Sequence, residues 1–107
     1  MSDSEPTRAL AHRVDAAARA VEGVLRLYSA TPIPARLARR IAHPDEEAPL
    51  AVVERHPGRL AVTVSLGVSA LRAAPTTAGL VADAVRAGLH DQGPVDVHVR
   101  VSRVTED

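Results

Sequence analysis

Hydrophobic and polar residues alternate strictly in two segments of the second half of the chain. In residues 60–68 every even position is Leu or Val, and in residues 95–101 every odd position is Val. Successive side chains of a strand point to opposite faces of a sheet, so each segment predicts a strand with one apolar and one polar face. Residues 50–55 predict another strand, which the His56-Pro-Gly-Arg59 turn joins to residues 60–68 in a hairpin.

Two other segments carry apolar residues at the spacing of an amphipathic helix. The first covers residues 7–22 and stops at Gly23, and the second begins at Thr76 or Thr77 and runs to about residue 90. The apolar stripe of the first helix is Leu10, Val14, Ala17, Ala18 and Val21, whereas Arg8, Asp15, Arg19 and Glu22 lie off it.

The stretch between the first helix and the hairpin predicts two short elements. Residues 24–28 are apolar and predict an edge strand. After Pro32 and Pro34, apolar residues recur every four positions, which predicts a short amphipathic helix, and an acidic loop bounded by prolines follows over residues 43–49. The basic side of this short helix carries Arg36, Arg39 and Arg40.

These elements define a fold class. The strand 60–68, the second helix and the last strand form a crossover unit, in which the two strands run parallel. Both helices must bury a stripe, so we predict an α+β domain in which they pack on one face of a small mixed sheet. Its order is helix, strand, short helix, hairpin, helix, strand. This single domain covers residues 7–104, between a disordered lead over residues 1–6 and an acidic tail over residues 105–107.

Composition narrows the classes of function. The chain has 107 residues, no cysteine, and 13 basic against 13 acidic residues. Disulfides and thiolate metal sites are therefore excluded, and the balanced charge argues against a globally basic nucleic-acid binder. Tyr28 is the one aromatic residue, so bases have no stacking platform. No apolar run approaches the roughly 20 residues of a membrane span, and no signal peptide is evident, so we expect a cytoplasmic protein.

The polar faces of the paired strands are the first candidate surface. They carry Ala61, Thr63, Ser65 and Gly67 on one strand and Asp96, His98, Arg100 and Ser102 on the other. No further layer of the predicted fold covers this face. It is either a solvated sheet face or a surface for self-association, since small residues allow another backbone or helix to approach.

No set of residues predicts an active site. Asp96, His98 and Arg100 could combine a base with an anion-binding group, but they lie along an open strand, whereas catalysis favours a concave pocket. No two histidines have the four-residue spacing of a zinc site, and no glycine-rich phosphate loop is present. We therefore predict no catalytic residue, no metal site and no cofactor.

The basic segment is the second candidate surface. Arg36, Arg39 and Arg40 form either a solvated helix side that the acidic loop partly neutralises, or a site for an anionic partner. That partner could be a membrane surface, an acidic protein or RNA. Three arginines contribute only about 1 kcal/mol each near an anionic membrane, which is too little for firm anchoring.

The order of these motifs resembles the alkaline-shock-protein family, also called the cell-envelope stress response family. The resemblance rests on Val21-Glu-Gly-Val24 with Leu25-Arg-Leu-Tyr28, on Leu66-Gly67, on Leu80-Val-Ala-Asp-Ala-Val85, and on Val95-Asp-Val-His-Val-Arg-Val101 after a Gly-Pro turn. It covers most of residues 7–104. The segment 29–49 and the connection 70–75 are longer than in typical members, and the lysine-free, alanine-rich composition is typical of an actinobacterial member.

The resemblance implies a non-enzymatic protein of Gram-positive bacteria that serves cell-envelope stress homeostasis. It implies self-association into a homo-oligomer, and recruitment to the inner face of the membrane by a small membrane-anchored partner. The surface expected to meet a partner is the polar sheet face or the basic segment. The alternative is a small nucleic-acid-binding module that uses the segment Arg36–Arg40, against which the neutral charge and the missing aromatics argue.

Overall fold

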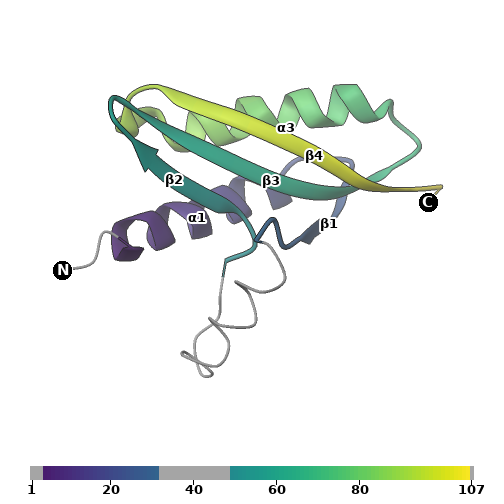
Figure 1. The fold of residues 1–107 in the computed structure, drawn as a ribbon. Coiled ribbons are helices and arrows are strands. Elements are labelled where there is room, and N and C mark those ends of the chain that lie inside the picture. The colour runs from purple at the N-terminus through teal and green to yellow at the C-terminus, as the bar shows by residue number, and fades with distance from the viewer. Residues whose placement is uncertain (1–3, 32–48, 107) are drawn as a thin grey trace, which may run out of the picture.

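The computed structural model describes residues 4–31 and 49–106, which form two long helices and a four-stranded sheet (Figure 1). The elements in order are α1 (Ser4–Arg19), β1 (Val24–Tyr28), β2 (Val52–His56), β3 (Arg59–Ser69), α3 (Ala74–Gly88), the 3₁₀ turn η1 (His90–Gln92) and β4 (Val95–Thr105). The short helix predicted within residues 29–49, and with it Arg36, Arg39 and Arg40, lies outside the described residues.

Strand β3 is the centre of the sheet. β4 runs parallel to it along one edge, from Leu60 opposite Val95 to Ser69 opposite Thr105. Along the other edge β2 and β1 lie end to end, both antiparallel to β3, with β2 opposite residues 59–63 and β1 opposite residues 65–68. This is the predicted α+β fold, a mixed sheet made of a hairpin and a crossover unit.

Both described helices cover the same face of the sheet (Figure 1). α1 packs on β1 and β2, α3 packs mainly on β4, and the two helices contact each other. The core between the layers contains Leu10, Val14 and Ala18 of α1, Val81, Val85 and Leu89 of α3 and its following turn, and Leu60, Val62, Val64, Leu66 and Val68 of β3. The even positions of β3 therefore form the buried face that the alternating pattern predicts.

The valines of β4 are less buried than those of β3. Val64 and Val68 are at most 1% exposed, whereas Val97 and Val99 pack against the core but stay half-buried. β4 is the outermost strand, so its apolar side chains have strand neighbours on one side only. The sheet thus ends in an incompletely covered apolar row.

Gly23 joins α1 to β1 at a position where a side chain would not fit. Its φ angle is +101°, a left-handed conformation that glycine adopts without strain. A Cβ atom there would lie 3.1 Å from the Thr77 hydroxyl oxygen of α3. Gly23 therefore allows the α1–β1 turn to approach the first turns of α3 closely.

The element ends differ from the sequence-based expectation by a few residues. α1 begins at Ser4, inside the predicted lead over residues 1–6, and α3 begins at Ala74 instead of Thr76 or Thr77. Pro6 and Pro75 each lie near the start of their helix, where proline replaces an amide that has no partner within the helix. α1 ends at Arg19 instead of residue 22, because the Val21 amide bonds to the Ala18 carbonyl in a tight turn. β4 reaches Thr105, the first residue of the predicted acidic tail.

Candidate interaction surface

The outermost strand carries an exposed row of charged and polar side chains. Asp96, His98 and Arg100 of β4 are all exposed and point to the sheet face opposite the helices. The register with β3 places Thr63 beside His98, and Ser65 beside Arg100. Alternate residues of a strand are about 7 Å apart, so the three charged or titratable groups form a line and do not converge on one point.

Asp96 is already paired within the chain. Its carboxylate forms an ion pair with the guanidinium of Arg59, whose Nε lies 3.1 Å away, and the side chains of Arg59 and Asp96 are 55% and 67% exposed. Ion pairs with this exposure are screened by solvent and contribute about 0–1 kcal/mol. The pair leaves most of the Asp96 carboxylate open to another cation.

Part of the predicted polar surface is covered by the chain itself. Ser65 is only 2% exposed, and its hydroxyl hydrogen-bonds to the hydroxyl of Ser102, the residue at an irregularity in the β3–β4 register. The ring of Tyr28 lies over Gly67, where a Cβ would come within 3.1 Å of a ring carbon, and the Arg26 guanidinium carbon lies 5.7 Å from the ring centroid. The expectation of an uncovered face is therefore wrong at Ser65, because Tyr28 and Ser102 close that end of it.

Asp96, His98 and Arg100 do not line the hollow found in the described part of the molecule. The residues that line this hollow are Arg19, Leu50 and residues 24–27. All of them lie far from His98 in the sequence. Among the described residues, no group of three or more His, Cys, Asp or Glu side chains could hold a metal ion. No described helix is long and apolar enough to cross a membrane.

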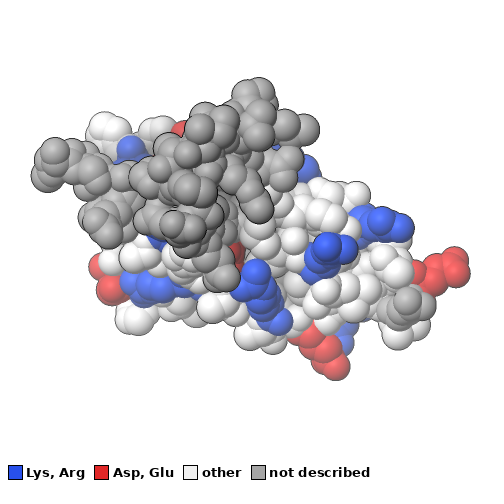
Figure 2. All heavy atoms as spheres, turned by 90° about the horizontal axis from the view of Figure 1, so that it is seen from below, with Lys and Arg blue, Asp and Glu red and all other residues white. Residues whose placement is uncertain are grey.

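On the face seen from below, the described surface carries both basic and acidic side chains (Figure 2). Figure 2 shows Arg side chains interspersed with Asp and Glu side chains over the uncovered part of the face seen from below. Several arginines are paired with acids, among them Arg72 with Glu22 at 3.2 Å and Arg86 with Asp83 at 3.6 Å. The anionic-partner hypothesis therefore rests on the segment Arg36–Arg40, outside the described residues.

Asp15 is a buried polar residue that the sequence pattern places wrongly. It was expected off the apolar stripe of the first helix, but it is 4% exposed. Its two carboxylate oxygens accept hydrogen bonds from the backbone amides of Leu50, at 2.8 Å, and Ala51, at 2.9 Å. Asp15 therefore ties α1 to the chain entering β2. The signal in the sequence is only partial, because two neighbours of Asp15 on the helix surface, Ala11 and Ala18, are small, whereas the other two, His12 and Arg19, are polar.

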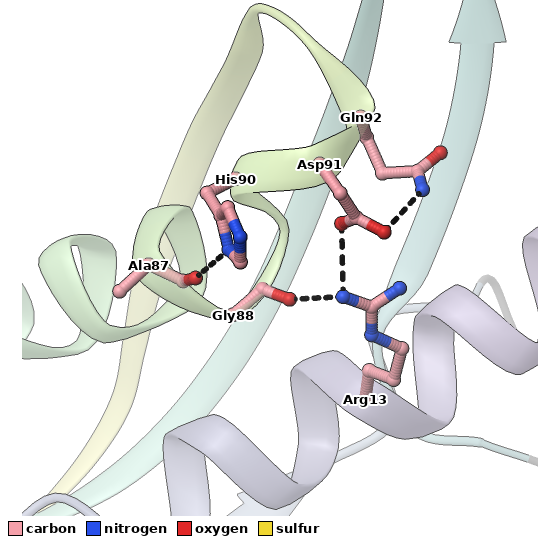
Figure 3. Close-up of polar contacts among 6 residues, drawn as sticks. All are labelled: Arg13, Ala87, Gly88, His90, Asp91 and Gln92. Carbon is pink, nitrogen blue, oxygen red and sulfur yellow. Dashed lines mark hydrogen bonds and ion pairs between the residues drawn. The ribbon is translucent and has the colours of Figure 1, made fainter.

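A second polar cluster ties α1 to the end of α3 (Figure 3). The Arg13 guanidinium donates to the Gly88 carbonyl and, at 3.0 Å, to the Asp91 carboxylate. The hydrogen bond from Arg13 to Asp91, with a further one from the side-chain amide of Gln92, holds the pKa of Asp91 below its usual value. The cluster satisfies a carbonyl at a helix C-terminus, where a cation is also favoured by the helix dipole. Its role is structural.

Comparison with known proteins shows the fold. No family model matches the chain, and no curated protein matches it. Solved structures of MamM CTD variants do: one has a TM-score of 0.55 at 15% identity and covers 95% of this chain and 99% of that chain. Another has a TM-score of 0.55 at 13% identity, with 99% and 97% covered. At this identity the likeness is one of fold. The resemblance to the alkaline-shock-protein family stays a prediction.

Proposed function

We propose that the chain is a non-enzymatic interaction domain that associates with itself. The observation that carries this proposal is strand β4. It is 11 residues long, pairs with β3 on one side only among the described strands, and exposes a row of charged side chains on one face. An open strand of this length is a template for pairing with another chain.

The shape of the surface supports a non-enzymatic role. His98 and Asp96 lie on an open sheet face, exposed to water on the same side. Acid–base catalysis depends on groups that converge on a substrate in a water-poor pocket, which a flat strand does not provide. A flat, charged face is suited to contact with another macromolecular surface.

The proposal also includes a cellular role and a location for the protein. The resemblance to the alkaline-shock-protein family supports a role in cell-envelope stress homeostasis, in the cytoplasm, with recruitment to the membrane by a small membrane-anchored partner. A short gene for a membrane-spanning protein beside this gene would support such recruitment. Pull-down of the tagged chain from solubilised membranes should then recover that product, and recovery equal to that of an untagged control would contradict it.

Self-association is tested by sedimentation velocity on the full chain. We expect the weight-average sedimentation coefficient to rise between about 5 µM and about 1 mM, the range in which interfaces of moderate size associate. A strictly monomeric boundary at the highest concentration would contradict the proposed function.

Binding of the basic segment to membranes is tested separately. Vesicles containing phosphatidylserine at low salt should retain the chain if the segment meets an anionic surface. Replacement of Arg36, Arg39 and Arg40 by Ala should abolish that retention, and wild-type and variant chains that sediment equally would contradict the idea. Neutral phosphatidylcholine vesicles are the control for adsorption.

A further inference from the structure

The backbone of β4 presents unpaired groups along its outer edge. The Leu60 amide donates to the Pro94 carbonyl at 3.0 Å, so the even-numbered residues at the start of β4 direct their backbone groups toward β3. Backbone groups of successive residues in a strand point to opposite edges. Val95, Val97, Val99 and Val101 therefore present their amides and carbonyls to the open edge, where no described strand pairs with them.

The sequence of this edge is symmetric about His98. Residues 95–101 read Val-Asp-Val-His-Val-Arg-Val, with Val at matching distances on both sides of His98 and opposite charges at Asp96 and Arg100. An antiparallel second copy with its His98 opposite this His98 would place Asp96 opposite the partner's Arg100. The same ion pair would form a second time with the roles exchanged.

This register also matches the direction of the backbone groups. With His98 on the two-fold axis, Val97 lies opposite the partner's Val99, and both present their amides and carbonyls to the shared edge. The hydrogen-bonded pairs of an antiparallel ladder can therefore form on both sides of the axis. An axis at Val99 would place Arg100 opposite the partner's His98, and an axis at Val97 would place Arg100 opposite the partner's Pro94, so either loses the Asp–Arg pairs.

Charges on an outer strand commonly prevent pairing with other chains. Here Asp96 and Arg100 would disfavour pairing with most other strands. They would favour an antiparallel copy of the same strand, because each charge then lies beside a charge of opposite sign. Like charges placed directly opposite each other destabilise a strand pair, whereas opposite charges stabilise it. The charge pattern therefore selects both the partner and the register.

The helix above β4 leaves room for a second copy. One side of α3 faces α1 and the turn that follows α1, since Thr77 lies against Gly23 and Gly88 lies against Ala17. At 100° per residue, Ala78 and Ala82 lie on the flank turned away from α1, and both are half-buried. Two copies joined along β4 would bring their α3 helices near each other, and small side chains permit a close approach.

We propose that two copies of the chain pair antiparallel along their β4 strands, with His98 on the two-fold axis and Asp96 bound to the partner's Arg100. The proposal rests on the self-association proposed above and assigns its surface and register. It joins the two sheets into one continuous sheet with the helices on a common face.

Charge exchange tests the register. Arg100→Asp should weaken dimerisation in sedimentation equilibrium by about 30-fold, since two attractive cross-strand pairs become two repulsive ones. Asp96→Arg combined with Arg100→Asp should restore most of the affinity. Arg103→Asp is the matched control, because it makes the same charge change on the same strand beyond the symmetric segment, and Arg59→Ala controls for loss of the Arg59–Asp96 pair. Equal affinities of wild type and Arg100→Asp would overturn the proposal.

The absence of cysteine in the sequence permits a direct test of geometry. A pair that is not hydrogen-bonded has Cα atoms about 4.5 Å apart, within the range that a disulfide spans. His98→Cys should therefore give a disulfide-linked dimer under mild oxidation. Arg103→Cys should not, because five residues from the axis the two sulfurs would be about 30 Å apart.

The outcomes separate the two proposals. A wild-type chain that stays monomeric overturns both the self-association and the β4 pairing. A wild-type dimer in which His98→Cys fails to cross-link, or cross-links no faster than Arg103→Cys, overturns the β4 pairing and leaves self-association through another surface. Circular dichroism of each variant establishes that it is folded before association is compared.

Discussion

Substitution of Asp15 tests whether one buried carboxylate holds the start of β2 in place. The carboxylate lies in α1, is almost fully buried, and accepts two backbone hydrogen bonds from Leu50 and Ala51. Asp15→Asn keeps the size of the side chain but replaces one acceptor oxygen by an NH₂ group. That group faces a backbone amide, so one donor loses its acceptor.

The expected cost follows from the number of bonds lost. A hydrogen bond to a charged group contributes about 1.5–3 kcal/mol, and a buried donor left unsatisfied costs about 1–3 kcal/mol. Asp15→Asn should therefore destabilise the fold by about 2 kcal/mol. Asp15→Ala leaves both amides unsatisfied and should cost about 3–5 kcal/mol, after a gain of roughly 0.5 kcal/mol from the higher helix propensity of alanine. For a domain of this length, a loss of 2 kcal/mol lowers the Tm by about 10 °C.

Urea unfolding followed by circular dichroism measures these differences, and amide hydrogen exchange locates them. The amides of Leu50 and Ala51 should exchange faster in Asp15→Asn, while β3 amides follow the change in global stability. Asp83→Asn is the matched control, since Asp83 is an exposed acid on α3 that pairs with Arg86 at 3.6 Å. If Asp15→Asn changes the free energy of unfolding no more than this control, Asp15 does not anchor β2.

Three other substitutions test single contacts. Thr77→Val should leave the stability unchanged or raise it by about 1 kcal/mol in urea unfolding, because the fully buried Thr77 hydroxyl has no hydrogen-bond partner among the described residues; a loss above 1 kcal/mol would show that the hydroxyl is satisfied. Gly67→Ala should displace the ring of Tyr28, which changes Tyr28 fluorescence and near-ultraviolet dichroism and destabilises by about 1–3 kcal/mol; an unchanged spectrum would contradict this packing. Asp91→Asn should lower the Tm at neutral pH, and the difference from wild type should vanish as pH falls through the lowered pKa of Asp91, since a depressed pKa stabilises only the ionised state; a difference that persists at acid pH would exclude the Arg13 contact as its cause.

The sequence predicted the fold correctly in those segments where the apolar residues follow one clear period, either that of a strand or that of a helix. β3 alternates without interruption, so its buried face and its hairpin with β2 follow from the side-chain period of two. The parallel pairing of β4 follows from the intervening helix, since parallel strands need a long crossover. Helix ends were placed less accurately, because capping and tight turns depend on contacts such as that between Gly23 and Thr77.

Polar groups that the fold buries could not be located from the pattern. The hydrophobic stripe of the first helix predicts that Asp15 lies on the surface. Its burial is favourable only because the chain that enters β2 places the amides of Leu50 and Ala51 against its carboxylate. Tyr28 likewise ends a short edge strand, and only the register of β1 against β3 places its ring over Gly67. In both cases the deciding neighbour lies more than 30 residues away.

Strand β4 connects the stability of the fold with the proposed association. Its inward valines are half-buried in a single chain, so a second copy along the edge would remove more of their apolar surface from water. Its outward charges contribute little to the monomer, because the ion pair between Arg59 and Asp96 is mostly exposed. Val99→Ala should therefore lower both the Tm and the affinity between copies, whereas Arg100→Asp should lower the affinity and leave the Tm of the diluted monomer unchanged. Fold and partner choice are then encoded on opposite faces of the same strand.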